Sequence, residues 1–236
     1  MIVPPLGRRL RRKEWDFYGV TTRDHYVGIV IAHAGYLGVV AAQWIDLATA
    51  RVVAERASVT PFGAGVRLGD RSDEGDVRYS FRSTSLAIEH DGPRRRVGGA
   101  WGDLTIELEL GYAPGVEVVA PLDGGRGVYH NHKIPALPAR GSIQLGARTE
   151  TIDGFATLDW GRGIWPYRTS WRWAAAQGRL ADGRAIGLTL GDVSADPGAP
   201  REDALFVDNV LTKLAPIDFT FDRGSALQPW RFRNDR

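Results

Sequence analysis

The side chains able to do chemistry are most concentrated between Asp159 and Trp173. This stretch reads DWGRGIWPYRTSWRW and holds four of the eight tryptophans and three arginines. In a strand from Thr169 onward, successive side chains alternate, so Trp171 and Trp173 share a face with Thr169 while Arg172 takes the other. Two glycines flank Arg162 and predict a tight bend that presents Asp159 and Arg162.

Two interpretations of this stretch remain open. In the first, the indoles are core, Asp159 caps the bend and Arg172 packs on a ring. In the second, the aromatic side chains wall a pocket for an apolar or sugar-like ligand, and Asp159 with an arginine supplies polar contacts. The pocket interpretation makes Asp159 a candidate acid or base and nominates as binding residues Trp160, Arg162, Trp165, Tyr167, Trp171, Arg172 and Trp173.

A second unusual stretch places His130 and His132 two residues apart. On a strand both imidazoles point the same way, a spacing that metal sites use, while Asn131 and Lys133 face the other side. No third ligand is adjacent in sequence, which favours ordinary hydrogen bonding over a metal. We therefore expect no metal or other cofactor, and we count His130, Asn131 and Lys133 as binding candidates.

Three functions fit these residues. The first is an enzyme acting on a hydrophobic molecule, a hydratase, isomerase or cyclase, in which Asp159 transfers a proton, its pKa raised by the indoles. Nearby arginines would oppose that shift. The second is a lipocalin-like carrier or structural module without chemistry. The third is a carbohydrate-active protein using Asp159 and Glu202, which requires carboxylates about 5 Å or roughly 6.5–9.5 Å apart.

Composition excludes several other classes. The chain has no cysteine, so disulfides and thiolate chemistry are absent. Thirty basic residues balance 28 acidic ones, giving a net charge of +2, and this near balance argues against a nucleic-acid partner. The amino-terminal residues lack the apolar run of a secretory signal, and no stretch is long and apolar enough to span a membrane. We expect a cytoplasmic protein whose partner is a small-molecule ligand.

The periodicity predicts an all-β protein built as an antiparallel meander. Strands are expected at 104–110, at 77–82 and at 217–222, where apolar and polar residues alternate. Residues 39–56 are expected to form a strand, a turn at 46–50 and a second strand. Asp-Gly pairs at 91–92, 123–124, 153–154 and 182–183 predict hairpin turns. One domain over 1–236 is expected, with halves 1–125 and 126–236 as an alternative division, the second incomplete.

The two stretches also resemble a known family, the bacterial domain of unknown function DUF2804. The resemblance is carried by residues 159–167 and 171–174, by 186–191, by 15–20, by 129–133 and 137–141, and by 202–205 and 229–230. It implies a calycin- or lipocalin-like barrel or sandwich, distantly similar to carotenoid hydratase-like double-barrel proteins. It implies no reaction, because the family has no assigned activity and a fold alone does not determine one.

The chain departs from the family pattern at three places. Asp203 and Pro135 stand where asparagine is expected, which puts polar contacts there in doubt. Family members also continue past the Pro229-Trp230 landmark, so a carboxy-terminal truncation that removes final strands and leaves an open sheet edge is expected.

Overall fold

The computed structural model describes residues 10–122, 124–192, 200–225 and 227–234, and within these ranges the extended regular elements are all β-strands. They are β1 (Arg12–Thr21), β2 (His25–His33), β3 (Leu37–Asp46), β4 (Arg51–Pro61), β5 (Val66–Arg67), β6 (Val77–Phe81), β7 (Thr84–Asp91), β8 (Arg94–Trp101), β9 (Leu104–Leu110), β10 (Val116–Leu122), β11 (Gly127–Leu145), β12 (Arg148–Ile164), β13 (Arg172–Arg179), β14 (Ala185–Asp192), β15 (Ala204–Val207), β16 (Val210–Lys213), β17 (Asp218–Thr220) and β18 (Arg231–Arg233).

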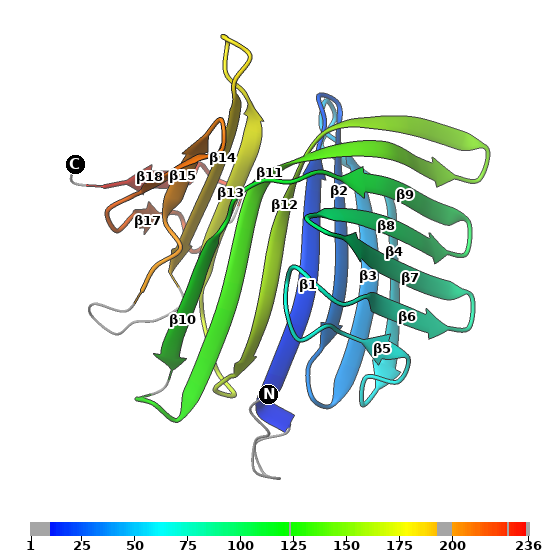
Figure 1. The fold of residues 1–236 in the computed structure, drawn as a ribbon, viewed down its shortest axis with the longest axis horizontal. Helices are drawn as coiled ribbons and strands as arrows, with labels where there is room; N and C mark the ends of the chain where they lie inside the picture. Colours follow the sequence, from blue (N-terminus) through cyan, green and yellow to red (C-terminus); the bar gives the residue numbers. More distant parts are fainter. Residues whose placement is uncertain (1–9, 123, 193–199, 226, 235–236) are drawn as a thin grey trace.

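These strands form three antiparallel sheets. The large sheet has twelve strands in the order β4-β3-β2-β1-β12-β11-β9-β8-β7-β6-β5, with β10 also paired to β11. A second sheet has the order β13-β14-β15-β16, and β17 pairs with β18. Figure 1 shows the second sheet standing beside the part of the large sheet that contains β10, β11 and β12. The predicted all-β, antiparallel, calycin-like fold class is confirmed.

Alternating burial explains why the predicted segments become strands. In β9 the residues Leu104, Ile106, Leu108 and Leu110 are buried and the polar residues between them are not. The predictions at 77–82 and 39–56 are confirmed by β6 and by the β3–β4 pair, with the turn between Asp46 and Arg51. The strand expected at 217–222 is shorter, since β17 covers only Asp218–Thr220.

The Asp-Gly turn predictions are right at two sites and wrong at one. Gly92 and Gly183 adopt positive φ angles of 58° and 90° between paired strands. The pair at 123–124 includes Asp123, which lies outside the described residues. Asp153-Gly154 is inside β12, where a Cβ on Gly154 would overlap the carbonyl oxygen of Thr21. This glycine therefore serves close strand approach and makes no turn.

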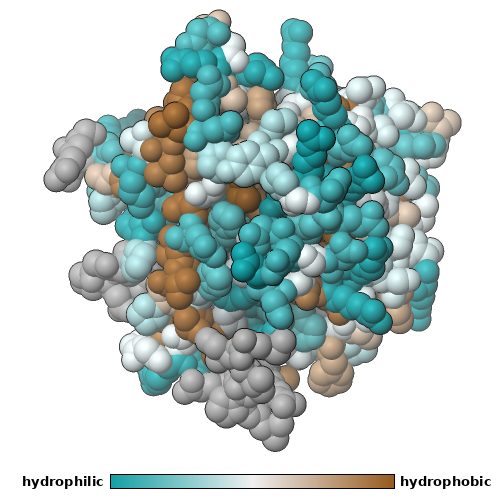
Figure 2. All heavy atoms as spheres, viewed as in Figure 1, coloured by the Kyte–Doolittle hydropathy of each residue, from teal (hydrophilic) through white to brown (hydrophobic). Residues whose placement is uncertain are grey.

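The large sheet curls around the main core. Contacts between its two ends, such as Ser58 Oγ to Tyr79 Oη at 2.6 Å, bring β4 against β6. The enclosed core contains fully buried Trp44 and Trp160 together with residues from both ends of the sheet. Figure 2 shows the face of the molecule seen in Figure 1, which is mostly hydrophilic, with hydrophobic residues gathered in a narrow band on the left.

Strand β11 changes partner half-way along its length. Its first part, Gly127–Lys133, pairs with β10, and its last part, from Ala139, pairs with β9. Between them the β11–β12 register shifts at Ile134/Leu137, and Ala136 has a φ of 61°. Pro135 lies in this bulge, where a residue without an N–H is tolerated because the ladder is interrupted there.

Asp203 forms the polar contacts that its departure from the family pattern had put in doubt. Its carboxylate accepts hydrogen bonds from the backbone N–H groups of Gly191 and Ile217 and from Arg201 Nε, at 3.0, 3.3 and 2.7 Å. Asp203 is completely buried. These bonds hold the chain just before β15 against β14, and so fix the position of the neighbouring Glu202.

Both ranges of the alternative division, 1–125 and 126–236, contribute strands to the large sheet, because β1 pairs with β12. In the described part of the chain, no helix long and apolar enough to cross a membrane is found.

Candidate functional site

Strand β12 carries the acidic end of the Trp-rich stretch and sorts its side chains between two faces. The bend predicted at residues 159–163 is wrong, because Asp159 to Gly163 lie inside this 17-residue strand. A Cβ on Gly161 would overlap the Trp15 indole, and one on Gly163 would meet the Val128 carbonyl oxygen at 2.5 Å. The glycines therefore make room for neighbours. Alternation then turns Trp160 into the core of the large sheet and Asp159 to its outer face.

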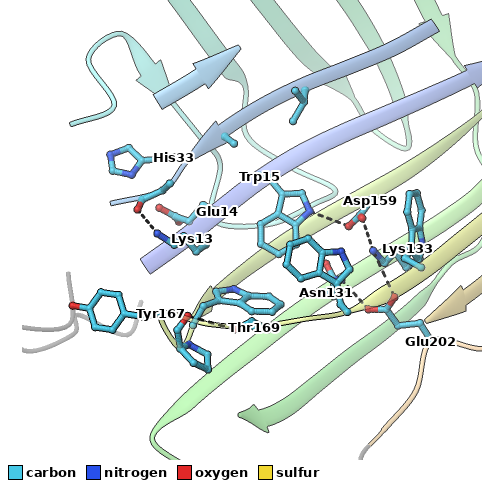
Figure 3. A pocket seen from close by; sticks show the side chains of 17 residues that line it. Lys13, Glu14, Trp15, His33, Asn131, Lys133, Asp159, Tyr167, Thr169 and Glu202 are labelled. Carbon is cyan, nitrogen blue, oxygen red and sulfur yellow. Dashed lines mark hydrogen bonds and ion pairs between the residues drawn. The ribbon is translucent and has the colours of Figure 1, made fainter. Parts of the chain in front are cut away.

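A cavity of about 470 Å³ lies where that outer face meets the segment 165–173 and Glu202. Figure 3 shows Trp15, Asn131, Lys133, Asp159 and Glu202 turned toward one another on one side, with Lys13, Glu14, His33 and Tyr167 on the other. The full lining comprises Lys13, Glu14, Trp15, Val30, Ala32, His33, Ala34, Asn131, Lys133, Asp159, Trp165, Pro166, Tyr167, Thr169, Trp171, Trp173 and Glu202.

The polar end of the cavity is a cluster built around Lys133. Lys133 Nζ lies 2.5 Å from Asp159 Oδ2 and 3.5 Å from Glu202 Oε2. Asn131 Nδ2 donates to Glu202 Oε1 at 2.8 Å, and Trp15 Nε1 donates to Asp159 Oδ1 at 3.0 Å. We call Asn131, Lys133, Asp159 and Glu202 the polar cluster. Alternation on β11 brings Asn131 and Lys133 to the cavity together, as their spacing predicts.

The two buried side chains Asn131 and Glu202 are only 3% and 1% exposed. Asn131 Oδ1 has no hydrogen-bond partner, and the polar contact of Glu202 Oε2 is the one to Lys133 Nζ at 3.5 Å. Burial raises the pKa of Glu202 above its usual 4.5, the charge of Asp159 raises it further, and Lys133 opposes both effects. A protonated Glu202 could donate a hydrogen bond, whereas Asp159 already accepts one from Trp15 and contacts the Lys133 ammonium.

Aromatic rings form the rest of the wall. The Trp165 ring centroid lies 5.7 Å from that of Trp15 and 6.2 Å from that of Trp171, so the three indoles form a continuous row. Trp173 closes the row near the polar cluster, its ring 4.7 Å from Lys133 Nζ and edge-to-face with Phe17. Thr169, Trp171 and Trp173 all line the cavity, in agreement with the predicted alternation, although β13 itself begins at Arg172.

The other predicted site residues lie elsewhere. His130, Trp160 and Arg162 line a separate cavity of about 330 Å³ on the opposite face of the strands. Arg162 Nη2 contacts Asp16 Oδ1 at 2.8 Å, and its guanidinium lies over the Trp160 ring. Arg172 approaches the ring of Phe219. The basic side chain beside Asp159 is therefore Lys133 and not one of the arginines that the sequence led us to expect.

The two histidines do share a face, but each contacts a different partner. His130 Nε2 is 2.5 Å from Glu117 Oε1, and His132 Nδ1 is 2.7 Å from Ser72 Oγ. Among the described residues no group of three or more histidine, aspartate or glutamate side chains is arranged to hold a metal.

The comparison with protein families agrees with the motifs. The family model for the domain of unknown function DUF2804 matches residues 3–236. The chain belongs to the DUF2804 family. No curated protein matches this DUF2804 chain.

Two solved structures are similar to this DUF2804 chain at low sequence identity. A protein of Nitrosomonas europaea described as an AttH is 17% identical, with a TM-score of 0.58, covering 89% of this chain and 70% of its own. Kievitone hydratase from Nectria haematococca is 13% identical with a TM-score of 0.48, covering 94% of this chain and 72% of its own. At 17% identity, the likeness to the Nitrosomonas europaea structure shows the calycin-like fold alone.

The sequence reasoning missed several cavity residues of this DUF2804 chain. Trp15 is the main one, because its indole both forms the wall and bonds Asp159. The available signal was the alternation of Trp15, Phe17 and Gly19 within a family motif. The contributions of β2, such as Val30 and Ala32, carry no signal of their own, since only the β1–β2 pairing brings them to this face.

Proposed function

We propose that this chain binds a small, mainly apolar molecule in the Trp-walled cavity, with a hydroxyl group of the ligand at the polar cluster. The observation that carries the proposal is Asn131 Oδ1, which is buried in the cavity wall without a hydrogen-bond partner, next to Glu202 Oε2, whose polar contact is Lys133 Nζ at 3.5 Å. A buried polar group without a partner costs about 1–3 kcal/mol. A ligand hydroxyl that donates to this amide oxygen recovers that free energy, which makes the polar cluster a recognition point.

The size and chemistry of the cavity support the same proposal. Its 470 Å³ falls within the range of about 300–1,000 Å³ typical of small-molecule pockets, and a few convergent polar groups in an aromatic wall are the usual arrangement there. The indoles of Trp15, Trp165 and Trp171 offer rigid apolar area at little entropic cost. A non-catalytic carrier needs no more than this.

Trp171 provides a direct test, because it lines the cavity yet is 62% exposed, so its removal should leave the fold intact. We expect aliphatic and aromatic alcohols to change the intrinsic tryptophan fluorescence, and Trp171→Ala to weaken their binding about tenfold, measured by calorimetry. Trp230→Ala, which removes an indole stacked on Phe221 outside the cavity, is the matched control and should bind as the wild type does. Equal affinity in both variants would place the ligand elsewhere.

A second candidate function is acid–base chemistry on the bound molecule, of the kind used in alkene hydration or isomerisation. The observation that favours it is Glu202, which combines a raised pKa with a position in the lining of the Trp-walled cavity, where its Oε2 has only a long contact of 3.5 Å to Lys133 Nζ. A neutral carboxylic acid can protonate a substrate, and ring faces stabilise the positive charge that develops. Glu202 then replaces Asp159 as the proton donor, and Asp159 holds Lys133.

The titration of Glu202 has a measurable effect on stability. Because its folded pKa is raised, its protonated form stabilises the fold below the unfolded pKa, and this contribution is lost as the pH rises through the folded pKa. We expect Glu202→Gln to gain stability relative to the wild type between pH 4 and pH 8, measured by urea denaturation. Glu109→Gln, an exposed strand glutamate, is the control and should track the wild type at every pH. Parallel profiles for Glu202→Gln and wild type would remove Glu202 as a proton donor.

The carbohydrate alternative has less support. Lys133 Nζ lies 2.5 Å from Asp159 Oδ2 and 3.5 Å from Glu202 Oε2. The distance between these two carboxylate oxygens therefore cannot exceed the sum of the two contacts. This spacing suits a covalent glycosidase mechanism better than one needing a water between the carboxylates. Glu202, however, is 1% exposed and committed to Asn131 and Lys133, which leaves it poorly placed to reach a bulky sugar.

A further inference from the structure

Another cavity, different from the one that His130 and Arg162 line, lies next to the Trp-walled cavity and shares one wall with it. This second chamber has a volume of about 390 Å³ and is lined by Phe17, Gly19, Thr21, Tyr26, Thr157, Trp173, Ala174, Ala175, Ala176 and Gln177. Trp173 also lines the first cavity, so a single indole separates the two spaces. The Phe17 ring meets Trp173 edge-on at 6.0 Å between centroids and completes the partition.

Strand geometry aligns the two chambers along one groove. On β1, Trp15 belongs to the first cavity and Phe17, Gly19 and Thr21 to the second, and these alternate residues share one face of the strand. On β12, Asp159 lines the first cavity and Thr157 lines the second. At a rise of about 3.3 Å per residue, Trp15 and Thr21 are roughly 20 Å apart along β1. The groove is therefore long and narrow.

Small side chains keep the second chamber open. On β13, Ala175 shares the face of Trp173 and Gln177, so its small side chain is turned toward the chamber that Gly19 and Thr21 also line. The Tyr26 hydroxyl lies over the paired Gly19 and Gly28, where an added Cβ would be 3.0 and 3.5 Å from it. The far end is closed by Gln177, whose Nε2 donates to the Gly19 carbonyl and to Thr21 Oγ1, both at 3.0 Å.

The polar cluster stands part-way along this groove. Lys133 lines the Trp-walled cavity, and its Nζ lies 4.7 Å from the ring of Trp173, the residue that also lines the second chamber. The buried Asn131 Oδ1, which has no hydrogen-bond partner, belongs to the same polar cluster. A ligand that used the whole groove would place its polar group in the middle and extend an apolar arm into each chamber.

We infer that the ligand is an elongated, mainly apolar molecule with a hydroxyl part-way along its chain, one arm of which passes Trp173 into the second chamber. This inference rests on the proposed binding function and adds the ligand class and a second subsite. It requires the Trp173 and Phe17 rings to move apart, which side-chain rotation at a partly exposed indole permits.

The test uses linear secondary alcohols with one short fixed arm and one arm of increasing length, titrated by calorimetry. In the wild type we expect affinity to rise about fourfold per added methylene until the second chamber is full. Ala175→Phe fills that chamber, and Ala175→Leu fills it partly. Both variants should bind the shortest alcohols as the wild type does and should reach a plateau at shorter arms, earliest for Ala175→Phe.

The control is Ala57→Phe, which adds the same volume at an exposed alanine on β4, away from both cavities, and should reproduce the wild-type series. If short alcohols bind but the wild type and Ala175→Phe show the same dependence on arm length, the second subsite is disproved and the proposed function stands. If no alcohol binds the wild type, both proposals fail.

Discussion

Replacing Lys133 with methionine is expected to destabilise the protein by about 3–5 kcal/mol at pH 7. Lys133 is 2% exposed and its ammonium contacts both Asp159 and Glu202. Methionine preserves the length of the side chain but leaves two carboxylates in a buried site without their cation. The free energy of unfolding, from urea denaturation, measures the effect.

The pH profile of the Lys133→Met variant identifies the cause. Without the ammonium that opposes it, burial raises the pKa of Glu202 further, so the deficit should be smallest near pH 4 and should grow as the pH rises. Adding Glu202→Gln to Lys133→Met should restore part of the lost stability. Arg140 lies on β11 with Lys133 and forms an exposed ion pair with Asp153 on β12, so Arg140→Met should change little at any pH. A deficit independent of pH would indicate lost packing alone.

Gly161→Ala is expected to reduce both stability and ligand affinity, although it adds one methyl group. That group would overlap the six-membered ring of Trp15, the indole directly across the β1–β12 ladder. The ring must move, which strains a packed wall by about 1–3 kcal/mol and breaks the Trp15 bond to Asp159. We expect a loss of about 2 kcal/mol in stability and of about a hundredfold in affinity for the alcohols.

Gly178→Ala is the matched control for Gly161→Ala. It lies on β13 next to the second chamber, and a Cβ there meets nothing within 4 Å. Stability and affinity should stay at wild-type values or rise slightly, because alanine restricts the unfolded chain more than glycine does. If Gly161→Ala behaved like Gly178→Ala, Trp15 would not be a fixed part of the wall.

Local alternation predicted more of this protein than its turn signals did. It identified β9, β6 and the β3–β4 pair, and it separated Asn131 and Lys133 from His130 and His132. The glycine signals at 153–154 and 161–163 were misleading, because glycine there provides space for a neighbouring strand or indole. A single sequence does not distinguish a glycine needed for its φ angle from one needed for its missing Cβ.

The identity of the cavity face could not be predicted. Trp160, Arg162 and His130 satisfy every requirement of residue type and still point away from the cavity, because the packing of the second sheet decides which face of β12 is covered. The partnership of Lys133 with Asp159 has the same origin, since it depends on the register of β11 against β12. These are long-range facts that no local pattern encodes.

The cavity walls come from two separate sheets, with Trp15 and Asp159 on the large one and Trp173 on the small one. A ligand bound there contacts both sheets and links them across the cavity that lies between them. Occupancy should therefore slow their separation, and the melting temperature should rise with ligand concentration.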